Sequence, residues 1–504
     1  MIFDLAAWRG ALTPDRPAVW DGTAWLTYRA LDCRATRLAQ RLHAQGVRKG
    51  DRVGILAPNH LLHLDSLLAA PKLGFVHTPY NYRLTAEELR RLLAEAAPKL
   101  LFVDDAMRGL LHGVDTTVVE LATYDDWLGR NAPPFPRPAL DDDDVWMMLF
   151  TGGSTGTPKG ALIPYRQVLA NAVNTIMAWG VTADDCAIQA TPMFHAGVNV
   201  LATPLLYAGG RLVLLAAFEP GAYLSLAEMH RVTLCFMVPT MYQLLADDPA
   251  FDGTDLSAVR WAICGGAPCA PLLRDTYAAR GVLFKLGYGL TEAGVNCFAI
   301  DAETARARPD SVGLPMPLLR AAIRRPDGTE AVADEIGELT LAGPAVFSGY
   351  HERPEETTRV LRDGWLWTGD LARRDAGGCF QIVGRRKEMY ISGGENVYPA
   401  EIEAALSQHP AVAECAVLGI PHPQWGETGL AAIVLTPGRL CDSSQLRTWL
   451  TQHLAGYKLP REFLFLQVLP KTAAGKINKP EILRVFERRH KKTGKKTICG
   501  HDNI

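Results

Sequence analysis

The sequence has no pair of cysteines spaced as CxxC, although its 504 residues include ten cysteines. Structural zinc sites use closely spaced cysteines or histidines, so zinc ligation is not expected. No apolar run reaches the roughly 18 residues that a membrane-spanning helix requires, and residues 1–6 carry no basic leader segment. These absences favour a protein of the reducing cytoplasm without integral membrane association.

An excess of charge of either sign is also missing. The chain has 52 Lys and Arg residues against 54 Asp and Glu residues, which gives a net charge of −2. A chain this balanced has no overall electrostatic attraction to nucleic acid, so none is expected as a partner. Apolar residues make up 48% of the chain and charged residues 21%, as in globular proteins, which excludes wholesale disorder.

Short aliphatic runs alternate with helical patterns through about the first 320 residues. Residues 52–57 predict a strand, 60–73 a helix and 75–78 the next strand. The same alternation predicts strands or helices at 211–215, 220–230, 233–237, 239–246, 259–263, 271–279 and 282–284. Alternation of this kind is typical of parallel, layered α/β structure.

The pattern changes near residue 318, where short strands and glycine turns begin. Strands are expected at 321–324, 337–341, 364–367 and 379–383, in a small antiparallel, barrel-like subdomain of about residues 318–386. Helices and strands alternate again over 388–487, which predicts a compact α+β domain and a boundary near residue 386. The basic segment 488–504 is expected to be a solvated, disordered tail.

One segment indicates phosphate binding. It is Thr151-Gly-Gly-Ser-Thr-Gly-Thr-Pro-Lys-Gly160, directly after the apolar run 145–150. Glycines let backbone N–H groups converge on an anion, hydroxyl groups add donors, and Lys159 adds charge. The P-loop motif GxxxxGK[ST] does not fit, because Pro158 precedes the lysine and Gly160 follows it. Taken alone, the segment also fits a plain glycine-rich hairpin.

Six further segments complete an ordered set along the chain. They are Pro192–Gly197, Cys264–Pro268, Leu286–Glu292, Trp367–Asp370, Gly384–Pro399 and Pro470–Lys476. With the glycine-rich loop they resemble the adenylate-forming superfamily of acyl-CoA and aryl-CoA synthetases, firefly luciferase and peptide-synthetase adenylation domains. The resemblance is strongest to the acyl-CoA ligases. One departure is Gly152, where the family usually has serine, so that one hydroxyl donor is missing.

The resemblance implies a large AMP-binding domain over 1–386, a hinge at Lys387, and a small mobile domain over 388–487. It also implies a two-step reaction. A carboxylate attacks the α-phosphorus of ATP to give acyl-AMP and pyrophosphate, and a thiol then takes the acyl group. The implied cofactors are ATP, Mg²⁺ and coenzyme A. Negative charge develops at the phosphates, so the site needs cations and hydrogen-bond donors.

The family motifs assign roles to single residues. By this resemblance the ATP phosphates are held by Thr151, Gly153, Ser154, Thr155, Gly156 and Lys159. The nucleoside is held by Gly265, Gly266, Ala267, Gly287, Tyr288, Gly289, Asp370 and Arg385, with Tyr288 stacked on adenine. Thr291 is expected at the α-phosphate and Glu292 at Mg²⁺. Lys476 is expected between the substrate carboxylate and the phosphate, where it offsets their repulsion.

His195 narrows the choice of acid. Amino-acid-activating relatives have an aspartate here, and salicylate-activating relatives have an asparagine one position later, where this chain has Ala196. A histidine at this position is similar to the gate of acyl- and aryl-CoA ligases. The acyl pocket is expected to be lined by His195, Asn199, Val238, Met241 and Gly265. Small and apolar walls predict a hydrophobic monocarboxylic acid, aliphatic or aromatic.

The acceptor thiol is expected to pass Ser392, Gly393, Gly394 and Lys458. Free CoA and an acyl carrier protein share this thiol arm, and the lack of a large insertion among the 504 residues favours CoA. Three alternatives stay open: an acyl-AMP ligase that loads a carrier protein, an amide-forming or luciferase-like relative, and a non-catalytic nucleotide-binding scaffold. A homodimer is also left open.

Overall fold

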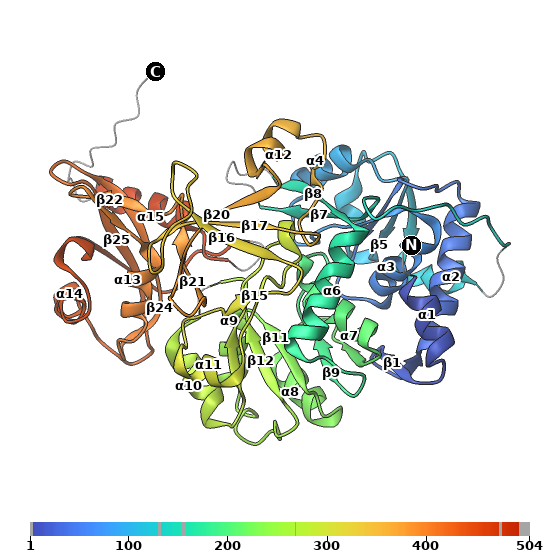
Figure 1. Cartoon of the computed structure of the whole chain (residues 1–504), viewed down its shortest axis with the longest axis horizontal. Coiled ribbons are helices and arrows are strands. Elements are labelled where there is room, and N and C mark those ends of the chain that lie inside the picture. Colours follow the sequence, from blue (N-terminus) through green and yellow to red (C-terminus); the bar gives the residue numbers. More distant parts are fainter. Residues whose placement is uncertain (1–3, 130–132, 153–157, 268, 473–475, 493–504) are drawn as a thin grey trace. The chain divides into compact units, whose positions relative to one another are not determined.

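A computed structural model describes residues 4–129, 133–152, 158–267, 269–472 and 476–492 (Figure 1). The chain divides into two compact units. The first, here called the N-terminal unit, comprises residues 1–266, 277–321 and 340–367. The second, the C-terminal unit, comprises residues 267–276, 322–339 and 368–504. The predicted hinge after residue 386 concerns motion and stays a prediction.

One sheet of the N-terminal unit carries the glycine-rich loop. Its strand order is β18-β8-β7-β4-β3-β5-β6. The strands are β3 (Arg52–Leu56), β4 (Val76–Pro79), β5 (Leu100–Val103), β6 (Thr117–Glu120), β7 (Val145–Thr151), β8 (Lys159–Pro164) and β18 (Gly349–Tyr350). Pairing is parallel from β6 to β7, whereas β8 and β18 pair antiparallel. Because β7 and β8 are the antiparallel strands of one hairpin, Thr151 and Lys159 lie side by side at its end.

The helices of this layer follow from their sequences. They are α2 (Tyr28–Ala44), α3 (Leu61–Leu73) and α4 (Ala86–Ala96). All 13 residues of α3 are buried, which accounts for leucine on most of its faces. Gly74 ends α3 with φ +81°, a conformation that suits glycine. Smaller elements are α1 (Leu5–Leu12), α5 (Tyr124–Leu128), α11 (Ala302–Ala307), α12 (Pro354–Val360), β14 (Phe298–Ala299) and β15 (Leu314–Pro315).

The second sheet has the order β13-β12-β11-β9-β10-β1-β2. Its strands are β1 (Pro17–Trp20), β2 (Trp25–Thr27), β9 (Cys186–Gln189), β10 (Arg211–Leu214), β11 (Leu234–Met237), β12 (Trp261–Cys264) and β13 (Phe284–Leu286). All pairs except β1–β2 are parallel. The helices of this region are α6 (Tyr165–Trp179), α7 (Ala202–Ala208), α8 (Pro220–Met229), α9 (Pro239–Ala246) and α10 (Pro271–Ala279). The predicted parallel α/β layers are therefore confirmed.

Two strands begin later than predicted. The N–H of Val259 donates to Leu256 in a turn, so β12 starts only at Trp261. The N–H of Val282 donates to Tyr277 at the end of α10, so β13 starts at Phe284. In both cases turn or helix-end hydrogen bonds use the residues that the apolar pattern had placed in a strand.

The β-rich segment that begins near residue 318 is a five-stranded sheet. Its order is β16-β17-β20-β19, with β21 paired to β20. The strands are β16 (Arg320–Arg324), β17 (Gly337–Ala342), β19 (Leu361–Arg362), β20 (Trp365–Arg374) and β21 (Phe380–Arg385). The chain passes from one unit to the other within β17 and within β20.

The C-terminal unit has a sheet of order β23-β22-β25-β24, with β26 on β25. Its elements are β22 (Tyr390–Ser392), β23 (Glu395–Val397), β24 (Val412–His422), β25 (Gly426–Leu435), β26 (Glu462–Leu466), α13 (Pro399–Leu406), α14 (Ser443–Thr451) and α15 (Lys479–Lys492). Alternate residues of β25 enter two cores, one with α13 and α14 and the other with α15. The predicted α+β domain is confirmed.

Helix α15 corrects the expected tail. It continues to Lys492, so residues 488–492 are helical rather than disordered. Arg489 donates to the carbonyl of Phe465 at 3.0 Å and thereby ties the helix to the end of β26. Residues 493–504 lie outside the described part of the chain. Within that part, every helix is too short or too polar to cross a membrane.

Candidate active site

The glycine-rich loop closes the β7–β8 hairpin. Thr151 pairs with Lys159 and Phe150 with Gly160, which fixes both ends of the loop. The predicted phosphate-binding residues Gly153, Ser154, Thr155 and Gly156 lie outside the described residues. Gly152 is exposed, and a Cβ atom there would meet no heavy atom within 4 Å. Packing therefore does not require glycine in place of the usual serine.

Glu292 lies against the start of this loop. Its Oε1 accepts hydrogen bonds from the Tyr350 hydroxyl at 2.9 Å and from the Thr151 hydroxyl at 3.4 Å. Tyr350 comes from β18, where it pairs with Ala161, the second residue after Lys159. The structure thus brings together two residues predicted from separate motifs, Thr151 and Glu292, and adds Tyr350 between them.

The carboxylate of Glu292 fits a Mg²⁺ ligand. Both of its hydrogen bonds use Oε1, and no described residue donates to Oε2. Mg²⁺ in nucleotide sites takes one or two carboxylates and fills its other positions with phosphates and water. Among the described residues no cluster of three or more His, Cys, Asp or Glu side chains is suited to hold a metal. A single carboxylate beside the glycine-rich loop matches the pattern of a nucleotide site, in which phosphates and water supply the other Mg²⁺ ligands.

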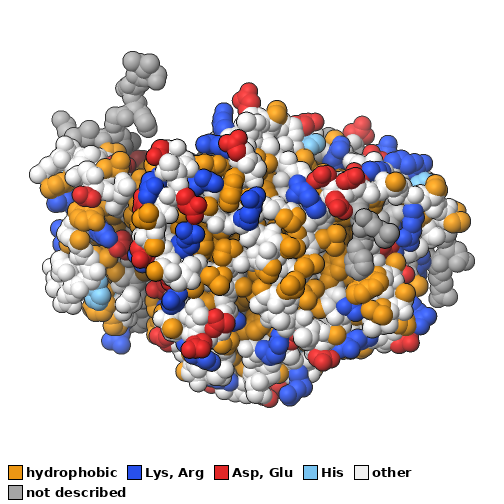
Figure 2. All heavy atoms as spheres, in the orientation of Figure 1, with side chains coloured by type: hydrophobic (Ala, Val, Ile, Leu, Met, Phe, Trp, Pro, Cys, Tyr) orange, Lys and Arg blue, Asp and Glu red, His pale blue; other side chains and the backbone are white. Residues whose placement is uncertain are grey.

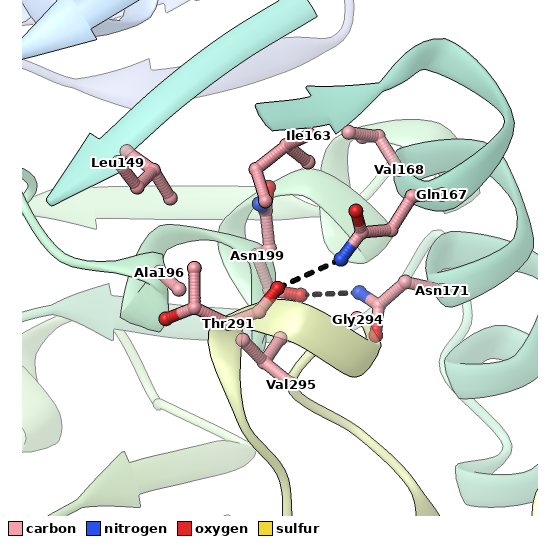
Figure 3. A pocket seen from close by; sticks show the side chains of 10 residues that line it. All are labelled: Leu149, Ile163, Gln167, Val168, Asn171, Ala196, Asn199, Thr291, Gly294 and Val295. Atoms are coloured by element: carbon pink, nitrogen blue, oxygen red, sulfur yellow. Dashed lines mark hydrogen bonds between the residues drawn. The ribbon is translucent and has the colours of Figure 1, made fainter. Parts of the chain in front are cut away.

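The turn that carries Glu292 is held by a buried amide. Gln167, on α6, donates from Nε2 to the carbonyl of Thr291 at 2.8 Å, as Figure 3 shows. Asn171, one turn further along α6, donates to the carbonyl of Asn199 at 2.7 Å. Both amides are 1% exposed, so neither has water to replace its partner. Helix α6 therefore positions the Thr291 turn and the segment after His195.

Lys159 has two partners near the loop. Its ammonium group forms an ion pair with Glu356 of α12 and lies 5.1 Å from the centroid of the Tyr350 ring. The ammonium of Lys159 holds the pKa of Glu356 below its usual range. Burial and the negative charge of Glu292 raise the pKa of Tyr350, which keeps its hydroxyl a proton donor. Neither Tyr350 nor Glu356 was expected from the sequence.

The predicted nucleoside glycines are packing glycines. A Cβ on Gly287 would lie 2.6 Å from Cγ2 of Ile263, and one on Gly289 would lie 1.8 Å from the carbonyl oxygen of Val295. Gly266 has φ +81°. Tyr288 packs edge-on against Phe298, with ring centroids 5.8 Å apart. Its stacking on adenine stays a prediction, as does a role for Ala267, which is exposed.

Asn199, expected in the acyl pocket, has partners within the fold. It is buried, its Oδ1 accepts from Thr203 at 2.8 Å, and its Nδ2 points to the Met147 sulfur at 4.0 Å. Its place in the acyl pocket stays a prediction. The small cavity that it lines measures about 10 Å³, room for at most one water molecule (Figure 3).

The ring of Phe236, a residue that the sequence did not single out, lies near two segments of the predicted acyl pocket. A Cβ placed on Gly197 would lie 3.7 Å from its ring, and one on Gly265 would lie 3.4 Å from it. The ring therefore stands between the His195 segment and the glycine turn. Val238 is close to Gly266, at 3.5 Å by the same measure, and Met241 is 9% exposed. Strand alternation was the available signal, because Phe236 lies on the opposite side of β11 from its neighbours Cys235 and Met237.

In the C-terminal unit, the two expected ribose ligands are adjacent. Asp370 on β20 pairs with Arg385 on β21, and their side chains form an ion pair of 3.2 Å. Asp370 is largely buried, whereas half of the Arg385 side chain is exposed. The backbone N–H of Asp370 donates to the hydroxyl of Thr368, which fixes the bend of the motif.

Lys387 and Lys476 are both exposed, and Lys387 lies on a turn. Lys387 follows β21, and the N–H of Met389 closes the turn on the carbonyl of Arg385 at 3.1 Å. Lys476 belongs to a hairpin in which Thr472 donates to its carbonyl at 2.7 Å and Lys471 pairs with Ile477. Neither position is fixed by burial, as residues of a moving segment require.

The residues expected along the thiol path have mixed settings. Gly393 and Gly394, with φ +62° and +90°, form the two-residue turn between β22 and β23. Ser392 is buried beside this turn. Lys458 forms an ion pair with Glu401 at 2.6 Å, so its charge is neutralised within the unit. The thiol path stays a prediction, without an unpaired cation at Lys458.

Comparison with known proteins extends these observations to the whole chain. The family described as AMP-binding enzyme matches residues 6–351, and the AMP-binding enzyme C-terminal domain matches residues 401–476. A feruloyl-CoA synthase from an Amycolatopsis species is 41% identical over 492 residues, 96% of this chain and 99% of its own. An indoleacetate–CoA ligase from Aromatoleum aromaticum is 34% identical over 505 residues, again 96% and 99%. Among solved structures, ATP-bound MatB from Rhodopseudomonas palustris has a TM-score of 0.88 and 30% identity, covering 97% of this chain and all of its own.

Proposed function

This chain belongs to the AMP-binding enzyme family, and from that premise we propose that its acid substrate is an aromatic monocarboxylate. The chain is an ATP-dependent acid–thiol ligase, which uses ATP, Mg²⁺ and CoA. The acid gives acyl-AMP and pyrophosphate, and the CoA thiol then displaces AMP to give the thioester.

The observation that carries the aromatic proposal is the Phe236 wall. Its ring lies against two glycine positions, Gly197 and Gly265, where no side chain covers it. A planar ring gains offset or edge contacts with such a wall, whereas a flexible alkyl chain loses more rotational freedom there. Two relatives named for aromatic acids, the feruloyl-CoA synthase and the indoleacetate–CoA ligase, support the same choice.

The phosphate side of the reaction falls to the N-terminal unit. We propose that Thr151 and Lys159, with the loop between them, hold the β- and γ-phosphates of ATP, and that Thr291 contacts the α-phosphate. Bound Mg²⁺ neutralises phosphate charge, and Glu292 is the residue proposed to hold it. Gln167 keeps the Thr291 turn in place through its backbone carbonyl.

The second group of residues belongs to the C-terminal unit. Asp370 and Arg385 are proposed ribose ligands, and their existing ion pair orients the carboxylate. Lys476 is proposed to neutralise charge between the acid and the α-phosphate during adenylation. Lys387 is the proposed pivot that brings Ser392, Gly393 and Gly394 to the thiol in the second step.

Free CoA is the proposed acceptor, with a carrier-protein thiol as the alternative. Both present the same pantetheine arm, so the acceptor has to be decided by direct addition of each. A cytoplasmic location is proposed because a ligase of this kind must meet ATP, acid and thiol in one compartment. A homodimer is proposed only as a state to be tested by light scattering.

The test is pyrophosphate release with a matched acid panel. Ferulate, indoleacetate and octanoate are supplied at equal concentration with ATP and Mg²⁺, before and after addition of CoA. We expect kcat/KM for the better aromatic acid to exceed that for octanoate by about tenfold or more. Phe236→Leu removes the flat wall and keeps its volume, so it should narrow this ratio. A preference for octanoate in the wild-type enzyme would contradict the proposal.

A further inference from the structure

The lysine of the phosphate loop already has an anionic partner. The ammonium group of Lys159 is paired with the carboxylate of Glu356, and their side chains are 13% and 24% exposed. A partly buried pair is screened less by salt than a fully exposed one. From this contact we infer that Glu356 is a resident counter-ion, which holds Lys159 in the nucleotide-free enzyme and which ATP must displace.

Glu356 is itself held in place. Arg353 lies 3.2 Å from Glu356 and 2.9 Å from Glu95 of α4, so a guanidinium group that Glu95 anchors holds the Glu356 carboxylate. Helix α12, which begins at Pro354, carries Glu356 in its first turn, where an anion suits the helix dipole. The carboxylate therefore stays near Lys159 without depending on that lysine.

Tyr350 connects this pair to the proposed metal ligand. The Lys159 ammonium lies 5.1 Å from the centre of the Tyr350 ring, and the hydroxyl of the same residue donates to Glu292. The pairing of β18 with β8 sets this position, because the N–H of His351 donates to Gly160 at 2.8 Å. Strand β18, which pairs with β8 next to the loop, therefore helps to set where the Lys159 side chain lies in the nucleotide-free enzyme.

The inference rests on the proposed role of Lys159 as a phosphate ligand. If the lysine must leave Glu356 to reach the phosphates, only molecules in which the ion pair is broken bind ATP fully. The apparent Kd then equals the intrinsic Kd divided by the fraction of molecules with the pair broken. Removing the charge of Glu356 should therefore tighten nucleotide binding. A residue that merely oriented Lys159 for ATP would have the opposite effect.

The neighbouring glutamate is a matched control. Glu355 lies one residue earlier on α12, has 88% of its side chain exposed, and lies 3.7 Å from Arg359. Its substitution by glutamine makes the same chemical change on the same helix without touching Lys159. Glu355→Gln should leave nucleotide affinity and melting temperature as in the wild type.

The experiment measures binding of the α,β-methylene analogue of ATP, with Mg²⁺ and without acid, by titration calorimetry. Because this analogue cannot be adenylated, the result reports binding alone. We expect Glu356→Gln to lower Kd by about threefold to fivefold, the range of a partly screened ion pair. Glu356→Ala should do the same, and the gain should shrink at high salt. Unchanged or weaker binding in folded Glu356 variants would overturn the inference.

A double-mutant cycle with Lys159→Met separates the counter-ion role of Glu356 from the proposed phosphate-binding role of Lys159. Lys159→Met alone should weaken binding; if it does not, the proposed role of Lys159 fails. With Lys159 absent, Glu356→Gln should give less than a twofold gain. A gain as large as in the wild-type background would mean that Glu356 repels the nucleotide directly, and the counter-ion role would be rejected.

Discussion

The proposed catalytic groups of the two units are held in different ways. In the N-terminal unit, Glu292 accepts two side-chain hydrogen bonds and Lys159 is paired with Glu356. In the C-terminal unit, Lys387 and Lys476 are both exposed. A group such as Glu292, proposed to stay with Mg²⁺ and the phosphates, gains from a fixed position, because a preorganised charge need not reorganise during reaction. A group needed in only one of two steps has to be able to leave.

Charged side chains of both signs share the surface that Figure 2 draws. Figure 2 shows basic and acidic side chains interspersed over the drawn face, as the net charge of −2 suggests. Such a surface does not concentrate one sign of potential, so the charges that matter for ATP are those fixed locally. Single-residue variants of these groups test the difference between the two units one position at a time.

The largest expected effect is that of Lys476→Ala. Its ammonium is proposed to act only while the carboxylate meets the α-phosphate, so acyl-AMP formation should fall by about 10²–10³-fold. Thioester formation from pre-made acyl-AMP and CoA should survive. Lys471→Ala is the control, since Lys471 lies in the same hairpin and pairs with Glu414 at 2.9 Å. An equal loss in both steps would assign Lys476 a role in folding instead.

Lys387→Pro should separate the two half-reactions. No described residue accepts a hydrogen bond from the Lys387 N–H, so proline removes none, but it fixes φ near −65° and restricts Arg386 as well. One half-reaction should fall by about 100-fold, as expected when a reacting group is held out of position, while the other survives. Lys387→Ala leaves the backbone free and should keep both. Loss of both rates together with a lower melting temperature would refute the pivot.

Asp370→Ala should raise KM for ATP. Each charge-assisted bond to the ribose is worth about 1.5–3 kcal/mol before compensation, so a net loss equal to one such bond raises KM by roughly 10- to 160-fold. The melting temperature should change little, because Arg385 is half exposed and water replaces its lost partner. Asp370→Asn keeps the shape of the side chain, so its KM for ATP should lie between those of the wild type and Asp370→Ala. Unchanged ATP kinetics would remove the ribose assignment.

Much of the fold followed from local pattern. Helices α9 and α10 have the predicted bounds, and strands β16, β17 and β21 lie within a few residues of theirs. The misses at β12 and β13 came from turn hydrogen bonds, which the apolar pattern does not record. Helix α15 went further than expected because one arginine ties its basic end to Phe465. Tertiary contacts of this kind override local composition.

The site was predictable only where a motif carried it. Thr151, Glu292, Asp370 and Arg385 were placed by their motifs, and the structure brings each pair together. Tyr350 and Glu356 are about 190 residues from the loop that they contact, and no motif spacing announces such a contact. The hydrogen bond from Thr203 to Asn199 was not predicted either, because it depends on the turn after His195. Long-range pairing decided these cases.

The smallest expected effect is that of Tyr350→Phe, which tests whether the fixed half of the contrast depends on this residue. The change removes the donor to Glu292 Oε1 and keeps the ring beside Lys159. Partners that orient a metal ligand affect metal affinity by about 10–100-fold. Because Thr151 remains as a second donor here, we expect the Mg²⁺ concentration for half-maximal adenylation to rise by roughly threefold to tenfold. The measurement is the adenylation rate against Mg²⁺ concentration at saturating ATP.

Two further variants divide the role of Tyr350 into its hydroxyl and its ring. Tyr350→Leu removes both, so it should add a change in KM for ATP to the change in Mg²⁺ dependence, because the cation–ring contact of Lys159 is lost as well. Tyr457→Phe is the control, since this tyrosine is 43% exposed and lies in the C-terminal unit. If Tyr350→Phe shifts only the melting temperature and not the Mg²⁺ curve, then Thr151 alone suffices to orient Glu292, and the fixed position of the carboxylate belongs to the β7–β8 hairpin rather than to β18.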